Sequence, residues 1–166
     1  MLHISSTGLV TIAGGKWTTY RKMAEDTVDQ AALLAFLEPR ISVTQELHIH
    51  GYHRNSAHFG VLSMYGSDAP ALQDLMEAEP QYSQVLHPRL DIRAGQVIWA
   101  VRYEMARTVE DFLARRPRAL LLDARASLAI APQVAALMAA ELGYDTVWEA
   151  TQIDEYNKIA ASYIVN

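Results

Sequence analysis

Hydrophobic residues recur at steps of three and four positions along most of this chain, which is the spacing of amphipathic helices. The first stretch covers residues 17–37, and its apolar stripe, which includes Trp17 and Tyr20, is predicted to pack in the core. This helix is predicted to end at Leu37, because Pro39 disfavours helical backbone at Glu38, the residue before it. Further helices are predicted at residues 56–65, 68–78, 94–115, 124–142 and 146–163. The pattern therefore predicts a mostly α fold.

Residues that favour helix ends support these boundaries. Gly66 and Gly143 directly follow two of the predicted helices, where a glycine commonly ends the helix. Asp123 is a candidate N-cap for the helix after it, and Asp145 or Thr146 is a candidate cap for the last helix.

Two helices carry further signals. Pro117 ends the helix predicted at 94–115, and Pro132 lies inside the pattern of 124–142. A proline there predicts either a kinked helix or two helices, the second of which starts at Pro132. The core stripe of the 94–115 helix is predicted to be Val97, Val101, Met105, Val109 and Phe112.

The chain begins with a different pattern. Residues 8–13 are apolar and β-branched and predict a short strand, with no partner strand in view. Residues 44–49 predict at most a short extended piece.

A turn on Gly14 and Gly15 joins the predicted strand directly to the first helix. Such a junction leaves the first backbone N–H groups of the helix unpaired at the positive end of the helix dipole. Lys16 and the hydroxyls of Thr18 and Thr19 lie beside them. The pattern predicts a place to hold a negative charge, although a Gly-Gly turn taken alone is more often only a turn.

Length and composition restrict what this turn can serve. The 166 residues suit one compact domain, or one domain with a fragment of another, and 51% hydrophobic with 20% charged residues is typical of a soluble protein. The net charge of -5 argues against nucleic-acid binding. The lack of cysteine excludes disulfides and thiol chemistry. Residues 128–142 are too short for a membrane span, so we expect a cytoplasmic protein, at most peripheral on the cytoplasmic membrane.

Several cofactor and nucleophile motifs are missing from the sequence. It contains no Gly-x-Gly-x-x-Gly fingerprint, no glycine-rich phosphate loop that ends in Lys-Ser/Thr, and no Gly-x-Ser-x-Gly elbow. The chain alone is therefore expected neither to bind a cofactor in full nor to supply a complete catalytic set.

Two runs resemble the FAD-dependent glycerol-3-phosphate dehydrogenases. The first is GLVTIAGGKWTTYRKMAE at residues 8–25, and the second is EMARTVEDFLARR at 104–116, continued by RALLLDARA at 118–126. They occur in the order and at about the spacing of that family, so the resemblance covers nearly the whole chain. Pro117 departs from it, since a threonine-like residue is expected there, and it can tighten the turn.

The resemblance implies a C-terminal third of such an enzyme. Residues 1–44 would be the edge of the FAD/substrate-binding domain, and residues 45–166 a bundle-like helical C-terminal domain. The implied reaction oxidises sn-glycerol 3-phosphate to dihydroxyacetone phosphate and passes electrons through FAD to a quinone. The implied partners are the N-terminal FAD domain of the same polypeptide, a membrane surface and a second copy in a homo-oligomer.

The resemblance also implies roles for the turn. Gly14 and Gly15 would let the backbone approach the flavin, Lys16 would act near the flavin or the substrate phosphate, and Thr18 and Thr19 would donate hydrogen bonds. Lys16 is thus the catalytic candidate, and the isolated chain is expected to be inactive. The alternative is a free-standing helical module for protein or membrane-surface interaction, which would have no need of the intact turn.

Each of the other candidate residues has a structural explanation as well as a functional one. His48, His50, His53 and His58 form a loose pattern that does not favour a metal. The arginines of 115–118 could hold a phosphate, but pairing with Glu110 or Asp111 is favoured. Arg21 faces either the site or solvent. Trp148, Tyr156 and Tyr163 are candidates for an interface, and core burial explains them equally well.

Overall fold

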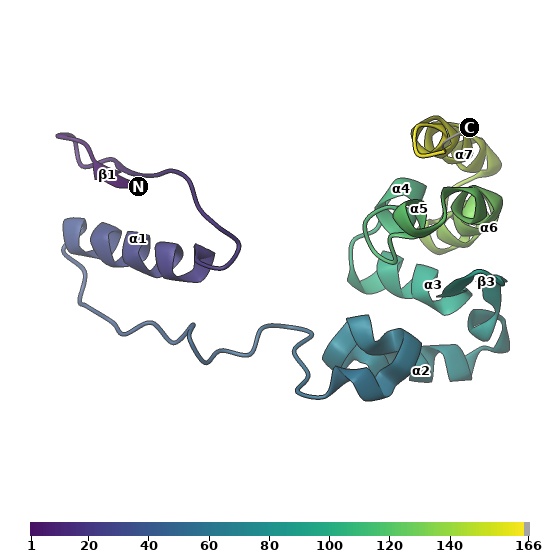
Figure 1. The fold of residues 1–166 in the computed structure, drawn as a ribbon, viewed down its shortest axis with the longest axis horizontal. Helices are drawn as coiled ribbons and strands as arrows, with labels where there is room; N and C mark the ends of the chain where they lie inside the picture. Colours follow the sequence, from purple (N-terminus) through teal and green to yellow (C-terminus); the bar gives the residue numbers. More distant parts are fainter. Residues whose placement is uncertain (165–166) are drawn as a thin grey trace. The chain divides into compact units, whose positions relative to one another are not determined.

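The computed structural model describes residues 1–164 and contains two compact units (Figure 1). The amino-terminal unit is Met1–His50, and the carboxy-terminal unit begins at Gly51. The mostly α fold is confirmed, with two small two-stranded sheets in the described part of the chain. The assignment of residues 1–44 and 45–166 to two domains of a larger enzyme stays a prediction.

The amino-terminal unit is a hairpin followed by one helix. Strand β1 (Leu2–Ile4) pairs antiparallel with β2 (Val10–Ile12), so the predicted strand does have a partner. Helix α1 (Tyr20–Leu34) begins later and ends earlier than predicted. Its start is delayed because the N–H groups of Thr19 and Tyr20 both donate to the Lys16 carbonyl and close a turn.

The rest of this unit is irregular. Phe36 has a φ of 54°, a left-handed conformation that ends the helix before Leu37. Residues 44–46 form a turn and residues 47–49 have no regular structure, so no strand forms where the short extended piece was predicted.

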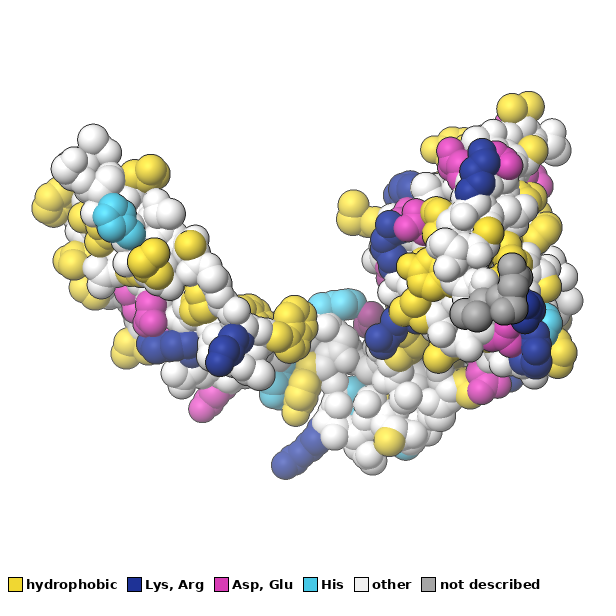
Figure 2. Space-filling model, turned by 45° about the horizontal axis from the view of Figure 1, so that its top comes forward, with side chains coloured by type: hydrophobic (Ala, Val, Ile, Leu, Met, Phe, Trp, Pro, Cys, Tyr) yellow, Lys and Arg dark blue, Asp and Glu magenta, His cyan; other side chains and the backbone are white. Residues whose placement is uncertain are grey.

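The predicted burial along α1 is also wrong. Among residues 1–50 no side chain is buried, and Trp17 and Tyr20 are 88% and 58% exposed. The physical reason is that a two-stranded hairpin covers only part of one helix face, and the described unit has no second layer. The visible face of this unit in Figure 2 accordingly carries hydrophobic side chains, drawn in yellow.

The carboxy-terminal unit is helical with one small hairpin. Its elements are η1 (Ser56–Asp68), α2 (Ala69–Ala78), η2 (Pro80–Ser83), β3 (Val85–His87), β4 (Leu90–Arg93), α3 (Ala94–Tyr103), α4 (Val109–Leu113), α5 (Ala119–Leu122), α6 (Ala124–Leu142) and α7 (Thr146–Ala161). The sequence pattern did not predict the β3–β4 hairpin.

The segment predicted as a helix at 56–65 is a 3₁₀ tract with two breaks. Gly60 and Gly66 have φ values of 57° and 54° with ψ of -122°, which interrupt the helical backbone. At Gly66 a Cβ atom would lie 1.8 Å from the carbonyl oxygen of Gly51, so only glycine fits this crossing.

The predicted 94–115 helix is two helices, α3 and α4. Met105 has a φ of 58° and is 78% exposed, so its assignment to the core is wrong. Arg116 holds the break in place, because its Nε donates to Glu104 Oε2 at 2.8 Å. Thr108 then caps α4 by accepting from the Asp111 N–H at 3.0 Å. The other four stripe residues are buried as predicted.

Several predicted helix ends are confirmed. Asp123 accepts from the Ala126 N–H at 2.9 Å and caps α6, and Asp145 accepts from the Trp148 N–H at 3.0 Å and caps α7. Gly143 ends α6 with a φ of 73°. Pro132 lies inside α6, which is one helix and not two.

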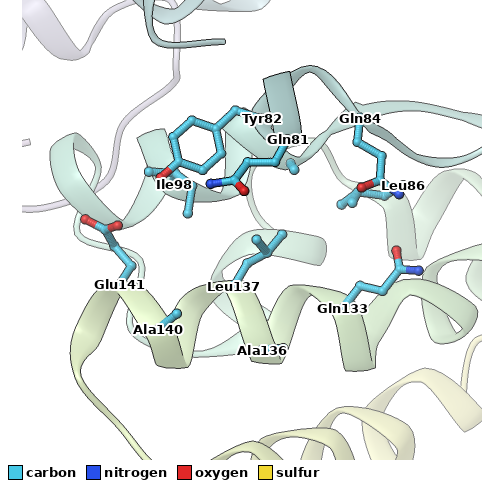
Figure 3. A pocket seen from close by; sticks show the side chains of 11 residues that line it. Gln81, Tyr82, Gln84, Leu86, Ile98, Gln133, Ala136, Leu137, Ala140 and Glu141 are labelled. Carbon is cyan, nitrogen blue, oxygen red and sulfur yellow. The ribbon is translucent and has the colours of Figure 1, made fainter. Parts of the chain in front are cut away.

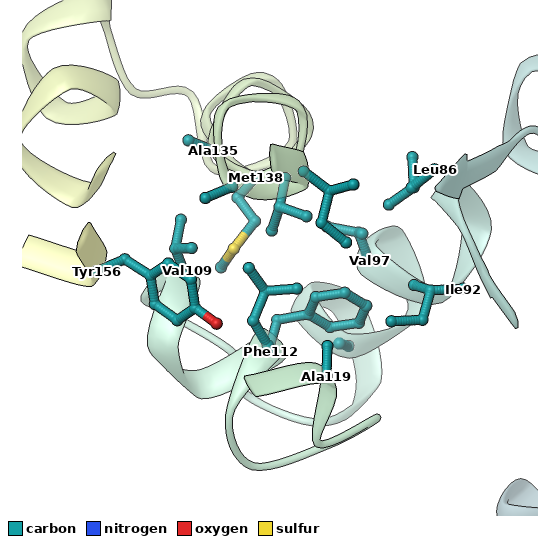
Figure 4. Close-up of a cluster of buried hydrophobic side chains, with 14 of the residues drawn as sticks. Leu86, Ile92, Val97, Val109, Phe112, Ala119, Ala135, Met138 and Tyr156 are labelled. Atoms are coloured by element: carbon teal, nitrogen blue, oxygen red, sulfur yellow. The ribbon is translucent and has the colours of Figure 1, made fainter. Parts of the chain in front are cut away.

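The main core lies between α3, α4, α6, α7 and the β3–β4 hairpin (Figure 4). Phe112, Val109 and Met138 are fully buried there. Tyr156, an interface candidate from the sequence, is 1% exposed, and its hydroxyl is hydrogen-bonded to the buried Ser127 hydroxyl. A second cluster joins η1 and α2 to Trp99 of α3. None of the helices in residues 1–164 combines the length and the hydropathy required to span a membrane.

Candidate functional site

The candidate site is the turn between β2 and α1. Gly14 and Gly15 have φ values of 84° and 149°, conformations that side-chain-bearing residues rarely adopt. A Cβ at Gly15 would lie 3.4 Å from Met23 Sδ, whereas nothing lies within 4 Å of a Cβ at Gly14. The turn is therefore open on its outer side and lies on the Met23 side chain on its inner side.

Within the described chain, unpaired backbone donors lie in the turn and in the first turn of α1. The N–H groups of Thr19 and Tyr20 donate to the Lys16 carbonyl at 2.9 and 3.1 Å, so the first N–H of the helix is already satisfied. By contrast, the five N–H groups of residues 14–18, and those of Arg21 and Lys22 in α1, make no hydrogen bond within the described residues. Consecutive free N–H groups of this kind can hold an anion. Unpaired donors are therefore present both in the turn and in the first turn of α1, and their use to hold an anion stays a prediction.

The predicted site side chains all lie on the surface of the turn. Lys16 and Thr18 are exposed, and neither side chain contacts a hydrogen-bond or ion-pair partner among residues 1–164. The Thr19 hydroxyl is directed inward, because it donates to the Lys16 carbonyl at 3.4 Å and lies 3.8 Å from Met23 Sδ. Lys16 and Thr18 are therefore available to a ligand, whereas Thr19 braces the turn.

An open hollow of about 760 Å³ lies over this turn. Gly14, Gly15 and Lys16 are among the residues that line it. Apolar and aromatic side chains form the rest, and the rings of Trp17 and Tyr20 lie 5.5 Å apart at 33°. A flat ligand with a negatively charged edge suits this combination.

A second hollow, of about 720 Å³, lies between α1 and residues 40–49. It shares Tyr20 and Ala24 with the hollow over the turn, so the two adjoin along the first turns of α1. Its apolar lining residues are Val28, Ile41, Val43, Leu47 and Ile49. Nothing in the hydrophobic pattern predicted this groove, because residues 40–49 form no regular element.

A cluster of charges follows the turn on α1. Glu25 is ion-paired with Arg21 at 2.5 Å and with Lys22 at 2.6 Å. The hydrogen bond from Lys22, followed by that from Arg21, lowers the pKa of Glu25 to about 2. The same contact with Glu25, followed by one with Asp26, raises the pKa of Lys22 to about 12. Glu25 is therefore ionised at neutral pH and is held by its two cationic neighbours.

The carboxy-terminal unit has a hollow of its own, of about 580 Å³ (Figure 3). Leu86, Ile98 and Leu137 form its apolar floor, and glutamine side chains lie around it. The carboxylate of Glu141 at its edge is already bound by Arg102 at 2.5 and 3.0 Å. This hollow therefore offers no free charged group for catalysis.

The remaining candidates have structural contacts. Arg115 pairs with Glu110 and Asp111, at 2.7 and 2.8 Å, as the favoured reading predicted. The His53 ring lies 5.2 Å from that of His58 and 4.9 Å from that of Phe59. Among residues 1–164 there is no cluster of three or more histidine, aspartate or glutamate side chains that could hold a metal ion.

Comparison with known proteins identifies the family. A family model described as the C-terminal domain of alpha-glycerophosphate oxidase matches residues 5–148, which include the whole turn. The chain is 31% identical to a probable mitochondrial glycerol-3-phosphate dehydrogenase of Caenorhabditis elegans, over 93% of this chain and 24% of the relative. It is 31% identical to the Schizosaccharomyces pombe mitochondrial glycerol-3-phosphate dehydrogenase, over 96% of this chain and 30% of the relative. The human mitochondrial glycerol-3-phosphate dehydrogenase is 30% identical, over 95% of this chain and 24% of the relative.

These relatives are much longer proteins, and the chain spans between about a quarter and a third of their length. The similarity nevertheless extends over both units of the chain, since the matched residues begin in the first hairpin and end in α7. The chain belongs to the family defined by the C-terminal domain of alpha-glycerophosphate oxidase.

Proposed function

We propose that this chain is the C-terminal portion of an FAD-dependent glycerol-3-phosphate dehydrogenase. The whole enzyme would oxidise sn-glycerol 3-phosphate to dihydroxyacetone phosphate and pass the electrons to a quinone. The observation that carries this proposal is the turn at residues 14–18, whose five free N–H groups lie beside an exposed lysine.

The residues of the turn fit a flavin. The absence of any atom within 4 Å of a Cβ at Gly14 leaves room for a flat ring against the backbone. Free N–H groups and the Lys16 ammonium suit the N1–C2=O edge, where a flavin that has taken a hydride carries negative charge. When bound, FAD supplies the acceptor for the hydride from C2 of the substrate, whose hydroxyl proton passes to a base.

Lys16 has two possible tasks in that arrangement. As a fixed positive charge, it would stabilise either the reduced flavin or the phosphate of glycerol 3-phosphate. Thr18 would donate its free hydroxyl to the same groups, and Thr19 would hold the turn from within. Gly14 and Gly15 would provide the close approach of the backbone.

The apolar side chains of the amino-terminal unit favour a partner within the same polypeptide. Trp17, Ile41 and Ile49 are 88%, 95% and 70% exposed, which is unusual for an independent soluble domain. The N-terminal FAD domain of the whole enzyme would cover them and would bring the remaining catalytic groups. The chain alone would therefore not turn over. An interaction module would also expose apolar side chains, so it is the intact turn, which such a module would not need, that favours the enzyme.

The electron acceptor and the location belong to the whole enzyme. The matching family is described as an oxidase, whereas the relatives are named dehydrogenases. Oxygen consumption in the absence of quinone, measured on the intact enzyme, separates the two acceptors. Peripheral attachment to a membrane and homo-oligomer formation stay predictions.

Substitution of Lys16 tests the function directly. In the intact FAD-loaded enzyme, Lys16→Met should lower kcat/KM for glycerol 3-phosphate by more than about tenfold, because a charge aimed at the reacting groups is lost. Lys22→Met is the matched control, since Lys22 contacts only Glu25 and Asp26 on α1. Equal kinetics for wild type and Lys16→Met would refute the role of the turn.

A further inference from the structure

Arg21 joins two parts of the amino-terminal unit that lie far apart in sequence. Its Nη1 donates to Thr44 Oγ1 at 2.9 Å and to Glu25 Oε2 at 2.5 Å. Thr44 Oγ1 also lies 2.8 Å from the Ser42 hydroxyl oxygen. The Arg21 side chain is only 30% exposed, so it is engaged with the chain itself and is neither free at the site nor free in solvent.

These contacts connect with the turn through the start of α1. The Lys16 carbonyl accepts from the N–H groups of Thr19 and Tyr20, and Arg21 is the next residue of the same helical turn. Thr44 lies on the wall of the hollow between α1 and residues 40–49, which adjoins the hollow over the turn. Two hydrogen bonds to the Lys16 carbonyl, the peptide bond from Tyr20 to Arg21 and the hydrogen bond from Arg21 to Thr44 therefore connect the turn with Thr44.

We propose that Arg21 is a positioning residue for the turn of residues 14–19. Through Thr44 it holds the start of α1 against residues 40–44, and it thereby keeps Lys16 and the free N–H groups at the ligand. This inference rests on the proposed function. A displacement of about 1 Å in such a group can slow a reaction about a hundredfold, so a tether outside the site is enough to change turnover.

A different result is expected if Arg21 only forms a surface ion pair with Glu25. Arg21 and Lys22 both contact Glu25, and as ion pairs on one helix face they would contribute little and would be interchangeable. Of the Arg21 and Lys22 side chains, only that of Arg21 is hydrogen-bonded to Thr44 in the described structure. If the contact with Thr44 matters, loss of Arg21 and loss of the Thr44 hydroxyl should have the same effect, and loss of Lys22 should have none.

The test uses the intact FAD-loaded enzyme with four variants. Arg21→Met and Thr44→Val break the contact, whereas Thr44→Ser keeps the hydroxyl and Lys22→Met removes only the neighbouring ion pair. Rates are measured per bound flavin, so that a smaller folded fraction does not count as slower chemistry. Hydrogen exchange of the 17–24 peptide, measured by mass spectrometry, reports the hydrogen bonds of Thr19, Tyr20 and Met23 without any turnover.

Arg21→Met and Thr44→Val should each change, by about tenfold, the same kinetic constant that Lys16→Met changes. The double variant Arg21→Met/Thr44→Val should show no larger change than Arg21→Met alone, because both substitutions break the same contact. Both should speed exchange of the 17–24 peptide, and Thr44→Ser and Lys22→Met should match wild type. Unchanged exchange, or faster exchange with unchanged constants, overturns the proposal. If Arg21→Met does not fold, the comparison of Thr44→Val with Thr44→Ser tests the proposal without it. If wild type does not oxidise glycerol 3-phosphate, the proposed function fails, and the exchange data still decide whether Arg21 holds the turn.

Discussion

The two units of this chain have similar hydrophobic patterns and opposite outcomes. In residues 1–50 the apolar side chains of α1 and of the segment after it remain on the surface, and none is buried. In the carboxy-terminal unit the same helical spacing yields two buried clusters, built from helices that cover one another. An apolar stripe thus indicates that a helix face will be covered, but not by what. The amino-terminal unit carries the candidate chemistry, and the carboxy-terminal unit carries the stability.

The largest expected effect is the difference in unfolding free energy between truncating a buried side chain and truncating an exposed one. Phe112→Ala in the isolated chain should lower the free energy of unfolding by about 3–5 kcal/mol, because Phe112 is fully buried. Trp17→Ala removes a larger ring yet should change the same quantity by less than about 0.5 kcal/mol, because Trp17 is 88% exposed. Denaturant unfolding followed by circular dichroism measures both. A loss at Trp17 comparable to that at Phe112 would break the contrast between the units.

A smaller effect is expected at the break between α3 and α4. Thr108→Ala should cost about 1 kcal/mol, because the N–H of Asp111 loses the hydroxyl that caps α4. Thr151→Ala is the matched control, since Thr151 is exposed on α7 and its hydroxyl only contacts the Val147 carbonyl. Thermal unfolding of the two variants should separate them. Equal melting temperatures would mean that α4 does not depend on this cap.

The smallest effect concerns the charge cluster of the amino-terminal unit. The folded pKa of Glu25 is about 2, below the value of 4.5 of an unperturbed glutamate, so the contribution of this cluster is fully present above pH 4.5. It should be lost as pH falls from there through about 2. Carboxyl chemical shifts from NMR would follow the titration, and Lys22→Met should raise the midpoint because the largest cause of the shift is removed. A wild-type midpoint above 4 would contradict the cluster.

Helix ends were predictable where a few neighbouring residues decide them. The caps at Asp123 and Asp145 and the stop at Gly143 depend on hydrogen bonds and backbone angles within one helical turn. The candidate turn was also evident, because two glycines and a lysine between a strand and a helix are local features. The Lys16 carbonyl accepts from the N–H groups of Thr19 and Tyr20, so the first N–H of the helix is paired, whereas those of residues 14–18, Arg21 and Lys22 are not paired within residues 1–164.

Where the prediction failed, distant residues decided the outcome. The break at Met105 is held by Arg116 on Glu104. The irregular η1 tract depends on Gly66 lying against Gly51. The clamp from Arg21 to Thr44 spans a segment with no regular pattern at all. None of these contacts has a signature in hydrophobic spacing, because each joins polar or backbone atoms from separate elements.

The sequence by itself determined the helical class, the local caps and the presence of a Gly-Gly turn before the first helix. It could do so because backbone preferences and apolar periodicity act over a few residues. Only the tertiary structure decided which stripes are buried, where long helices break and how the turn is braced. Those outcomes depend on which surfaces meet, and the described chain leaves Trp17 and Tyr20 88% and 58% exposed.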